Sequence, residues 1–113
     1  MAEQARAVLI TGASGGVGTA AVERLSKLGW QVFAGVRSTS GSQQRRAAGT
    51  VEQVVIDICD EESIARARAE IAGKLRGRGL DALINNAGLS ADGPLELVPV
   101  AELRRQFEVN VVG

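Results

Sequence analysis

The chain has 113 residues, which suits a single domain over residues 1–113 with its own buried core. Its thirteen basic and thirteen acidic residues cancel, so the overall charge predicts no binding to nucleic acid or to a membrane surface. No apolar run approaches the ~18 residues of a membrane span, and the N-terminus lacks the character of a signal peptide. A single cysteine, Cys59, excludes an internal disulfide and is typical of a cytoplasmic protein.

The first half of the chain alternates short apolar runs with amphipathic stretches. Residues 7–10 predict a strand that is apolar on both faces, and residues 31–36 predict a second strand. Between them, residues 16–28 predict a helix that ends at Gly29. The expected apolar face of this helix comprises Val17, Ala21, Leu25 and Leu28. Residues 39–48 predict a short polar helix.

The second half continues the alternation. Residues 54–58 predict a third strand and residues 80–84 a fourth. The helix expected at 61–76 begins after Asp60, its predicted N-cap, with acids in its first turn and arginines at its end. Its expected apolar stripe comprises Ile64, Ala67, Ile71 and Leu75. A last helix is predicted to begin near Val100, with Leu103, Phe107 and Val111 on one face.

This alternation indicates an α/β fold. Strands that are apolar on both faces favour a parallel sheet covered by helices on both sides. Right-handed crossovers then predict a doubly wound, Rossmann-like sheet with the strand order 3-2-1-4. No internal repeat or linker divides the chain.

The stretch TGASGGVG at residues 11–18 places four glycines directly after the first strand. In a doubly wound sheet this turn lies at the carboxyl edge, where ligands bind. Gly12 would allow the tight turn, Gly16 the approach of a pyrophosphate, and Gly18 close packing of the helix. Amides at the helix N-terminus would hold the anion. The binding residues expected here are Thr11, Gly12, Ser14, Gly16, Val17 and Gly18. The alternative is a flexible glycine-rich turn without a ligand.

Four motifs occur in a fixed order along the chain. They are Gly12-x-x-x-Gly16-x-Gly18, Asp57 after the third strand, Asn85-Asn86-Ala87-Gly88 after the fourth, and Asn110 in VNVVG. Together they resemble the short-chain dehydrogenase/reductase family across the whole chain. The resemblance implies a nicotinamide dinucleotide cofactor and hydride transfer between it and a carbonyl or alcohol.

The end of the second strand predicts which dinucleotide is preferred. NAD-binding folds of this kind carry an acid about 20 residues after the glycines, which bonds the ribose 2′-hydroxyl. No aspartate or glutamate occurs between Glu23 and Glu52, and Arg37 and Ser38 follow the strand instead. Because a guanidinium and a hydroxyl can hold a 2′-phosphate, NADP(H) is favoured over NAD(H). The alternative is that Arg37 is an ordinary solvated arginine.

The resemblance also implies roles near the adenine. Asp57 would accept a hydrogen bond from the adenine amino group, with the backbone of Ile58 beside the ring. Asn85, Asn86, Ala87 and Gly88 would brace the fourth strand and line the cofactor cleft. From the residues alone, Asp57 could instead end its strand, and the asparagines could stabilise their own loop. Cys59 is interpreted as a small packing residue, since no basic neighbour favours a thiolate.

The catalytic residues that the resemblance implies are largely missing. The family uses a tyrosine with a lysine four residues later, a serine, and an asparagine that supports a proton relay. This chain contains no tyrosine, and its two lysines, Lys27 and Lys74, fall in helices expected to pack on the sheet. Asn110 is the one counterpart. We therefore expect the N-terminal, cofactor-binding half of a reductase, inactive alone, with substrate and reaction direction left open.

An incomplete sheet predicts association. The fourth strand would be an open edge, and the stripe Leu103, Phe107 and Val111 would lack partners. We expect a homo-oligomer or a complementary chain to cover these surfaces. Two alternatives therefore stay open: half of a split reductase completed by a partner chain, or a non-enzymatic, nucleotide-responsive interaction module.

Overall fold

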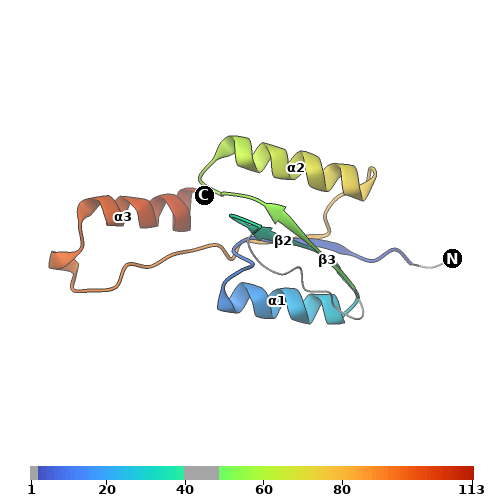
Figure 1. Cartoon of the computed structure of the whole chain (residues 1–113), viewed down its shortest axis with the longest axis horizontal. Coiled ribbons are helices and arrows are strands. Elements are labelled where there is room, and N and C mark those ends of the chain that lie inside the picture. Colours follow the sequence, from blue (N-terminus) through green and yellow to red (C-terminus); the bar gives the residue numbers. More distant parts are fainter. Residues whose placement is uncertain (1–2, 40–48) are drawn as a thin grey trace.

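A computed structural model describes residues 3–39 and 49–113 (Figure 1). The elements in chain order are β1 Ala7–Ile10, α1 Gly16–Lys27, β2 Gln31–Val36, β3 Thr50–Val55, α2 Glu61–Leu75, β4 Ala82–Ile84, a 3₁₀ turn Leu95–Leu97, α3 Val100–Phe107 and a π-helical segment Glu108–Val112. The polar helix predicted at 39–48 falls almost entirely on residues 40–48, outside the described residues.

The four strands form one parallel sheet in the order β3-β2-β1-β4, which confirms the predicted fold class and strand order. β1 lies in the interior of the sheet, where Ile10 is in register with Ala34 on one side and with Ile84 on the other. All four residues of β1 are buried, because α1 and α2 cover opposite faces of the sheet (Figure 1). The first two strands have the predicted bounds.

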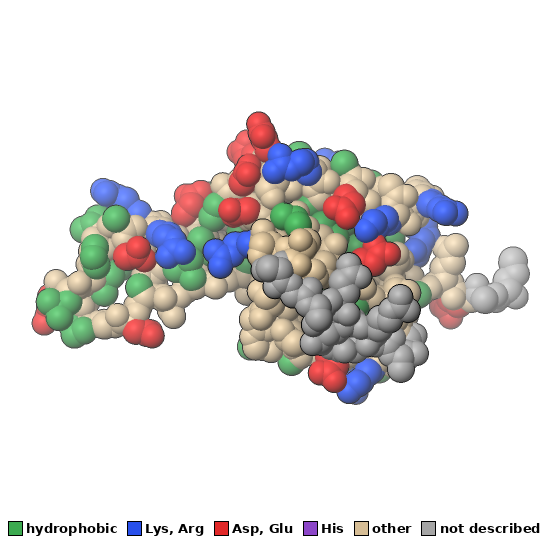
Figure 2. Space-filling model, viewed as in Figure 1, with side chains coloured by type: hydrophobic (Ala, Val, Ile, Leu, Met, Phe, Trp, Pro, Cys, Tyr) green, Lys and Arg blue, Asp and Glu red, His purple; other side chains and the backbone are tan. Residues whose placement is uncertain are grey.

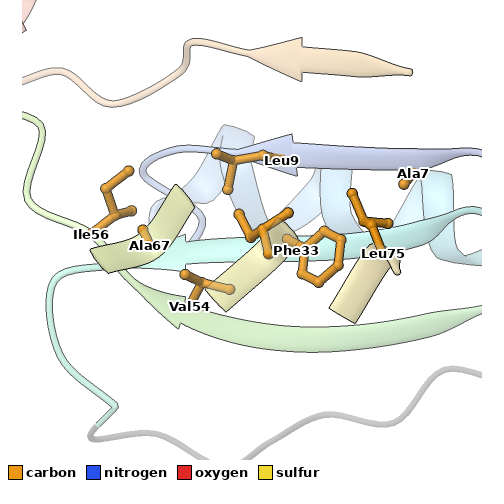
Figure 3. Close-up of a cluster of buried hydrophobic side chains, with 8 residues drawn as sticks. Ala7, Leu9, Phe33, Val54, Ile56, Ala67 and Leu75 are labelled. Atoms are coloured by element: carbon orange, nitrogen blue, oxygen red, sulfur yellow. The ribbon is translucent and has the colours of Figure 1, made fainter. Parts of the chain in front are cut away.

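Two apolar cores lie on the two faces of the sheet, because successive strand residues point to opposite sides. Toward α2, the core comprises Ala7, Leu9, Phe33, Val54, Ile56, Ala67, Ile71 and Leu75 (Figure 3). Toward α1, it comprises Val8, Ile10, Ala13, Val22, Val32, Ala34 and Val36. Phe33 is the largest fully buried side chain among the described residues.

The helices pack on faces slightly rotated from those predicted. In α1, the buried residues are Gly18, Val22 and Ser26, whereas Val17 and Leu28 are 75% and 57% exposed. The prediction for these two side chains is therefore wrong: the small residues Gly18 and Ser26 bring the helix closer to the sheet than an apolar stripe suggests. In α2, Ala67, Ile71 and Leu75 are buried as expected, but Ile64 is half-exposed.

Two strand boundaries also differ from the prediction. β3 begins at Thr50 and ends at Val55, so the predicted strand at 54–58 is placed too late in the chain. Its early residues are half-buried polar and apolar side chains at a sheet edge, a pattern without a continuous apolar run. β4 is limited to Ala82–Ile84, two residues shorter than the predicted strand at 80–84, and Asp81 just before it accepts a hydrogen bond from the Ala7 amide at 2.7 Å through its side chain.

Helix termini agree with the sequence. Asp60 caps α2 by accepting hydrogen bonds from the amides of Glu62 and Ser63 at 3.0 and 3.3 Å. Gly29, just after α1, has φ 85°, the left-handed conformation expected of a glycine that ends a helix. Both expected caps are confirmed.

The C-terminal helix α3 projects from the body of the molecule instead of lying on the sheet (Figure 1). The chain reaches it through a long loop after β4, and the principal extents of the molecule are 60 × 26 × 23 Å. Figure 2 shows hydrophobic side chains gathered at this projecting end. No helix within residues 3–39 and 49–113 is long and apolar enough to cross a membrane.

A pair of substitutions in α2 tests the assigned packing. We expect Ile71→Ala to lower the free energy of unfolding by about 2–5 kcal/mol, because Ile71 is 3% exposed and its removal leaves a cavity. Ile64→Ala in the same helix should cost less than about 1 kcal/mol, because Ile64 is 38% exposed. Urea unfolding monitored by circular dichroism measures both, and equal losses would contradict the assigned face.

Candidate cofactor cleft

The turn after β1 is shaped by close contacts at Gly12 and Gly18. Gly12 has φ 62°, and a Cβ atom there would lie 2.7 Å from Cα of Ala87. A Cβ on Gly18 would overlap the carbonyl oxygen of Gly12 and lie 2.8 Å from Nδ2 of Asn86. Only glycine fits both positions, so the start of α1 is pressed against the turn and against the segment after β4.

At Gly16 the situation is the opposite, because a Cβ atom there would meet nothing within 4 Å. Gly16 is exposed and begins α1, whose N-cap residue Gly15 offers no side-chain cap. The first turn of α1 also contains no acid. The positive end of the helix is therefore open to an anion that approaches along bare backbone.

Thr11 lies behind this turn and connects two strand ends. Its hydroxyl accepts hydrogen bonds from the amides of Asn86 and Ala87 at 3.1 and 3.0 Å, and donates one to the carbonyl of Ile84. Thr11 is only 5% exposed. With its hydroxyl occupied in this way, Thr11 acts as a brace between β1 and β4 and does not line the cleft described below.

The segment after β4 is tied to the same turn by Asn86. Its Nδ2 atom donates to the carbonyls of Thr11 and Gly12 at 3.2 and 3.1 Å. Asn86, Ala87 and Gly88 line the cleft, whereas Asn85 is exposed and lies outside it. The asparagine that stabilises the loop is thus Asn86.

Asp57 follows β3 at the cleft wall. Its backbone amide donates to Oγ of Ser63 at 2.9 Å, and its Oδ1 accepts from the Cys59 amide at 2.9 Å. These bonds fix the loop that presents Asp57, Ile58 and Cys59 to the cleft. Cys59 is exposed there, so its interpretation as a packing residue is wrong. Partial desolvation, followed by the charges of Asp57 and Glu108, raises the pKa of the Cys59 thiol, which keeps it protonated.

Arg37 and Ser38 follow β2 at the same edge of the sheet. Arg37 is exposed and lines the cleft; Ser38 is exposed but does not line it. Gly35, which sequence reasoning did not single out, also contributes to the wall. A Cβ on Gly35 would lie 2.8 Å from Cγ2 of Ile56 and 2.9 Å from the Ile10 carbonyl. A glycine inside an apolar strand is the signal that could have identified this close approach.

Asn110 fixes the loop after β4 through two hydrogen bonds to the backbone of Leu89. Its Oδ1 accepts from the Leu89 amide and its Nδ2 donates to the Leu89 carbonyl, both at 2.8 Å. Asn110 does not line the cleft; Arg105, Glu108 and Val109 do. Their spacing of three and four residues places them on one helical face, and this pattern was the available but unused signal.

These elements enclose a cleft of about 700 Å³ at the carboxyl edge of the sheet. Its wall comprises Gly12, Ser14, Gly15, Gly16, Val17, Gly18, Gly35, Val36, Arg37, Ile56, Asp57, Ile58, Cys59, Asn86, Ala87, Gly88, Leu89, Arg105, Glu108 and Val109. A volume of this order accommodates a ligand larger than a metabolite of a few atoms. Eleven of the predicted cofactor residues meet here; Thr11, Ser38 and Asn85 do not.

The cleft lacks a general acid of the expected kind, because the chain has no tyrosine or histidine. Lys27 pairs with Glu23 at 2.9 Å on α1, and Lys74 pairs with Glu52 and Glu70 at 2.6 and 3.1 Å on α2. The Glu52 hydrogen bond raises the pKa of Lys74. In the described part of the chain, no group of three metal-ligating side chains occurs.

Comparison with known proteins places the chain in a family. The profile of the short chain dehydrogenase family matches residues 6–113. An NADPH-dependent 3-dehydrocapnine reductase of Ornithobacterium rhinotracheale is 36% identical over 94% of the chain, and a 3-amino-tetrahydro-pyrrolizinone reductase of Xenorhabdus hominickii is 36% identical over 96%. The chain spans 38% and 37% of the lengths of these two relatives.

Solved structures agree with this placement. An NADPH-bound carbonyl reductase from chicken fatty liver superposes with a TM-score of 0.80 at 28% identity, over 97% of this chain and 47% of its own. An NADH-dependent reductase in complex with NAD also gives 0.80, at 26% identity, over 96% of this chain and 47% of its own. The chain therefore belongs to the short-chain dehydrogenase/reductase family of nicotinamide-dependent oxidoreductases.

Proposed function

We propose that this chain is the NADP(H)-binding portion of a short-chain dehydrogenase/reductase that acts on a carbonyl or alcohol. The observation that carries the proposal is the open helix N-terminus at Gly16, which faces a cleft with Arg37 at its wall. The bound nicotinamide would supply or accept the hydride. The residues of this chain would bind and orient the dinucleotide.

The pyrophosphate and the adenine of the cofactor would each have a matching part of the cleft. The pyrophosphate would lie against the backbone from Ser14 to Gly18, where helix amides and the absence of a side chain at Gly16 favour an anion. The adenine would lie between Asp57 and Ile58 on one side and the Ala87–Gly88 backbone on the other. The fixed loop at Asp57 leaves its second carboxylate oxygen for the amino group of the base.

The preference for NADP(H) rests on charge at the end of β2. A 2′-phosphate carries negative charge that Arg37 can pair with, and Ser38 follows it on the same loop. The chain has no carboxylate between Glu23 and Glu52 that would repel it. The relatives do not decide the matter, since one is named NADPH-dependent and one structural neighbour NADH-dependent.

Catalysis needs residues that this chain does not contain. A tyrosine that exchanges a proton with the substrate oxygen is absent, and neither lysine reaches the cleft. Asn110, the remaining counterpart of the family's catalytic set, is bonded to Leu89 and would position the loop at the nicotinamide side. We propose that the chain is inactive alone.

We also propose that it resides in the cytoplasm, because its single thiol forms no internal disulfide.

A split reductase is the second candidate. The observation that favours it is the exposed apolar surface at the end of α3 and in the π-helical segment that follows, where Phe107, Val111 and Val112 are 66–69% exposed. A second chain that covers this surface and the open edge at β4 could supply the serine, tyrosine and lysine. A homo-oligomer would cover the same surfaces without restoring activity.

Arg37→Gln tests the cofactor preference. Loss of a charge-assisted bond is worth about 1.5–3 kcal/mol, so NADPH affinity should fall about 10- to 150-fold while NADH affinity stays unchanged. Arg66→Gln, on the exposed side of α2, should change neither. Isothermal titration calorimetry with both coenzymes measures this, and wild-type binding of NADH as tight as NADPH would refute the assignment.

Gly16→Leu tests the placement of the pyrophosphate. Its side chain would enter open space in the cleft, so the fold should survive while affinity for NADPH and NADH drops at least tenfold. Gly73→Leu is the matched control, because Gly73 is also a helical glycine with nothing within 4 Å of a Cβ atom, and it lies outside the cleft. Unchanged binding by the Gly16 variant would show that the dinucleotide lies elsewhere.

The proposed lack of activity is tested directly. The chain mixed with NADPH and a panel of aldehydes and ketones should show no oxidation of NADPH at 340 nm above the rate without protein. Addition of a separately expressed C-terminal half from a relative is expected to restore turnover if the split-reductase candidate holds. Turnover by the chain alone would refute the assignment of the missing tyrosine as essential.

A further inference from the structure

Ser63 is a buried serine in the first turn of α2 that is bonded to a residue of the cofactor cleft. Its side chain is 4% exposed and does not line the cleft. Its Oγ accepts a hydrogen bond from the Asp57 amide at 2.9 Å. Asp57 itself is exposed at the cleft wall. A side chain outside the cleft therefore holds the backbone of a residue inside it.

This bond differs from the usual arrangement at the start of a helix. In a capping box, the side chain of the third helical residue reaches back to the amide of the N-cap residue. Here the amide of the N-cap residue Asp60 donates to the Asp57 carbonyl at 3.1 Å, and Ser63, the third helical residue, reaches the Asp57 amide instead. Asp60 caps α2 with its own side chain. The Ser63 hydroxyl thus serves the loop before the helix.

Two successive amides fix this loop to two different elements. The Ile56 amide donates to the Val36 carbonyl at the end of β2 at 2.9 Å. The Ile56 side chain lies in the same apolar core as Ala67 of α2 (Figure 3). The next amide, that of Asp57, is bonded to Ser63. The direction in which the Asp57 side chain leaves the backbone is therefore determined by β2 and α2 together.

A third bond orients the Asp57 carboxylate. Its Oδ1 accepts from the Cys59 amide at 2.9 Å, the bond of an Asx-turn. With Oδ1 held in this way, the position of Oδ2 follows from the backbone conformation at Asp57. Without the Ser63 hydroxyl, the Asp57 amide would lose its acceptor, and the loop that carries the carboxylate could rotate.

We propose that Ser63 is a positioning residue for adenine recognition: by holding the Asp57 backbone, it aims Oδ2 of Asp57 at the amino group of the base. This inference rests on the proposed function, in which Asp57 accepts that hydrogen bond. An ionised carboxylate only accepts hydrogen bonds, so it pairs with the amino group of adenine and not with the carbonyl oxygen that replaces it in hypoxanthine. Ser63 therefore affects the discrimination between these two bases, and not only the stability of α2.

Ser63→Ala tests this role by isothermal titration calorimetry with NADPH and with its hypoxanthine analogue. Wild type should bind NADPH at least about tenfold more tightly than the analogue, because a hydrogen bond to a charged group is worth about that factor. In Ser63→Ala this ratio should fall below about threefold, through loss of NADPH affinity. Ser63→Thr keeps the hydroxyl and should restore the ratio.

Ser26→Ala is the matched control. Ser26 is a fully buried serine of α1 that lies outside the cleft, and its hydroxyl has no hydrogen-bond partner in the described part of the chain. Its removal should leave the ratio of the two affinities unchanged. Hydrogen exchange measured without coenzyme gives an independent readout: the Asp57 amide should exchange at least about tenfold faster in Ser63→Ala than in wild type or Ser26→Ala.

A double-mutant cycle with Asp57→Ala separates positioning from a general structural role. In the Asp57→Ala background, Ser63→Ala should change NADPH affinity less than about twofold, because the carboxylate that Ser63 positions is gone. Equal losses in both backgrounds would overturn the inference. Circular dichroism checks folding, and Ser63→Cys, of similar size but with a weaker acceptor, gives the same test of the ratio if the alanine variant unfolds.

The outcomes for the two proposals differ. A wild type that binds neither dinucleotide refutes the proposed function, and the inference falls with it. A wild type that binds NADPH and its hypoxanthine analogue equally refutes the inference alone. So does a folded Ser63→Ala variant that keeps the wild-type ratio.

Discussion

The candidate site depends on the contact between the first turn of α1 and the carbonyl of Gly12. No side chain separates them, because a Cβ atom on Gly18 would overlap that oxygen. The helix therefore begins immediately above the strand end, and its free amides face the space beside Gly16. Asn86 extends this contact to the segment after β4 by bonding the carbonyls of Thr11 and Gly12. A single backbone turn thus fixes two walls of the cleft.

Much of this arrangement could be predicted from the sequence. The alternation of helices with strands that are apolar on both faces predicts the parallel sheet and its strand order. The glycines at positions 12 and 18, which admit no side chain, predict where the first helix meets its strand. Asp60 is predictable as the N-cap of α2, because a short acidic side chain before a first turn that contains acids is a local pattern. Features determined by a few adjacent residues can therefore be predicted from the sequence.

Other features were set by packing between distant segments. Thr11 looks like a phosphate donor in its motif, yet its hydroxyl is occupied by groups more than seventy residues away in the chain. Val17 fits an apolar stripe but lies exposed at the cleft, because small residues on the neighbouring face let α1 approach the sheet. The spacing of Arg105 and Val109 places them on one helical face, but that this face meets the cleft depends on where the helix lies in the fold, which the spacing alone does not specify.

The C-terminal helix changes to π-helical geometry over Glu108–Val112, which accommodates one more residue per loop of backbone hydrogen bonding. In a regular α-helix each residue advances by about 100°, so the loss of one residue from this segment would turn Asn110 away from Leu89. The number of residues between Val100 and Asn110 is therefore constrained by this contact. The position of Asn110 in the helix, and not only its side-chain amide, thus holds Leu89 in place at the wall of the cleft.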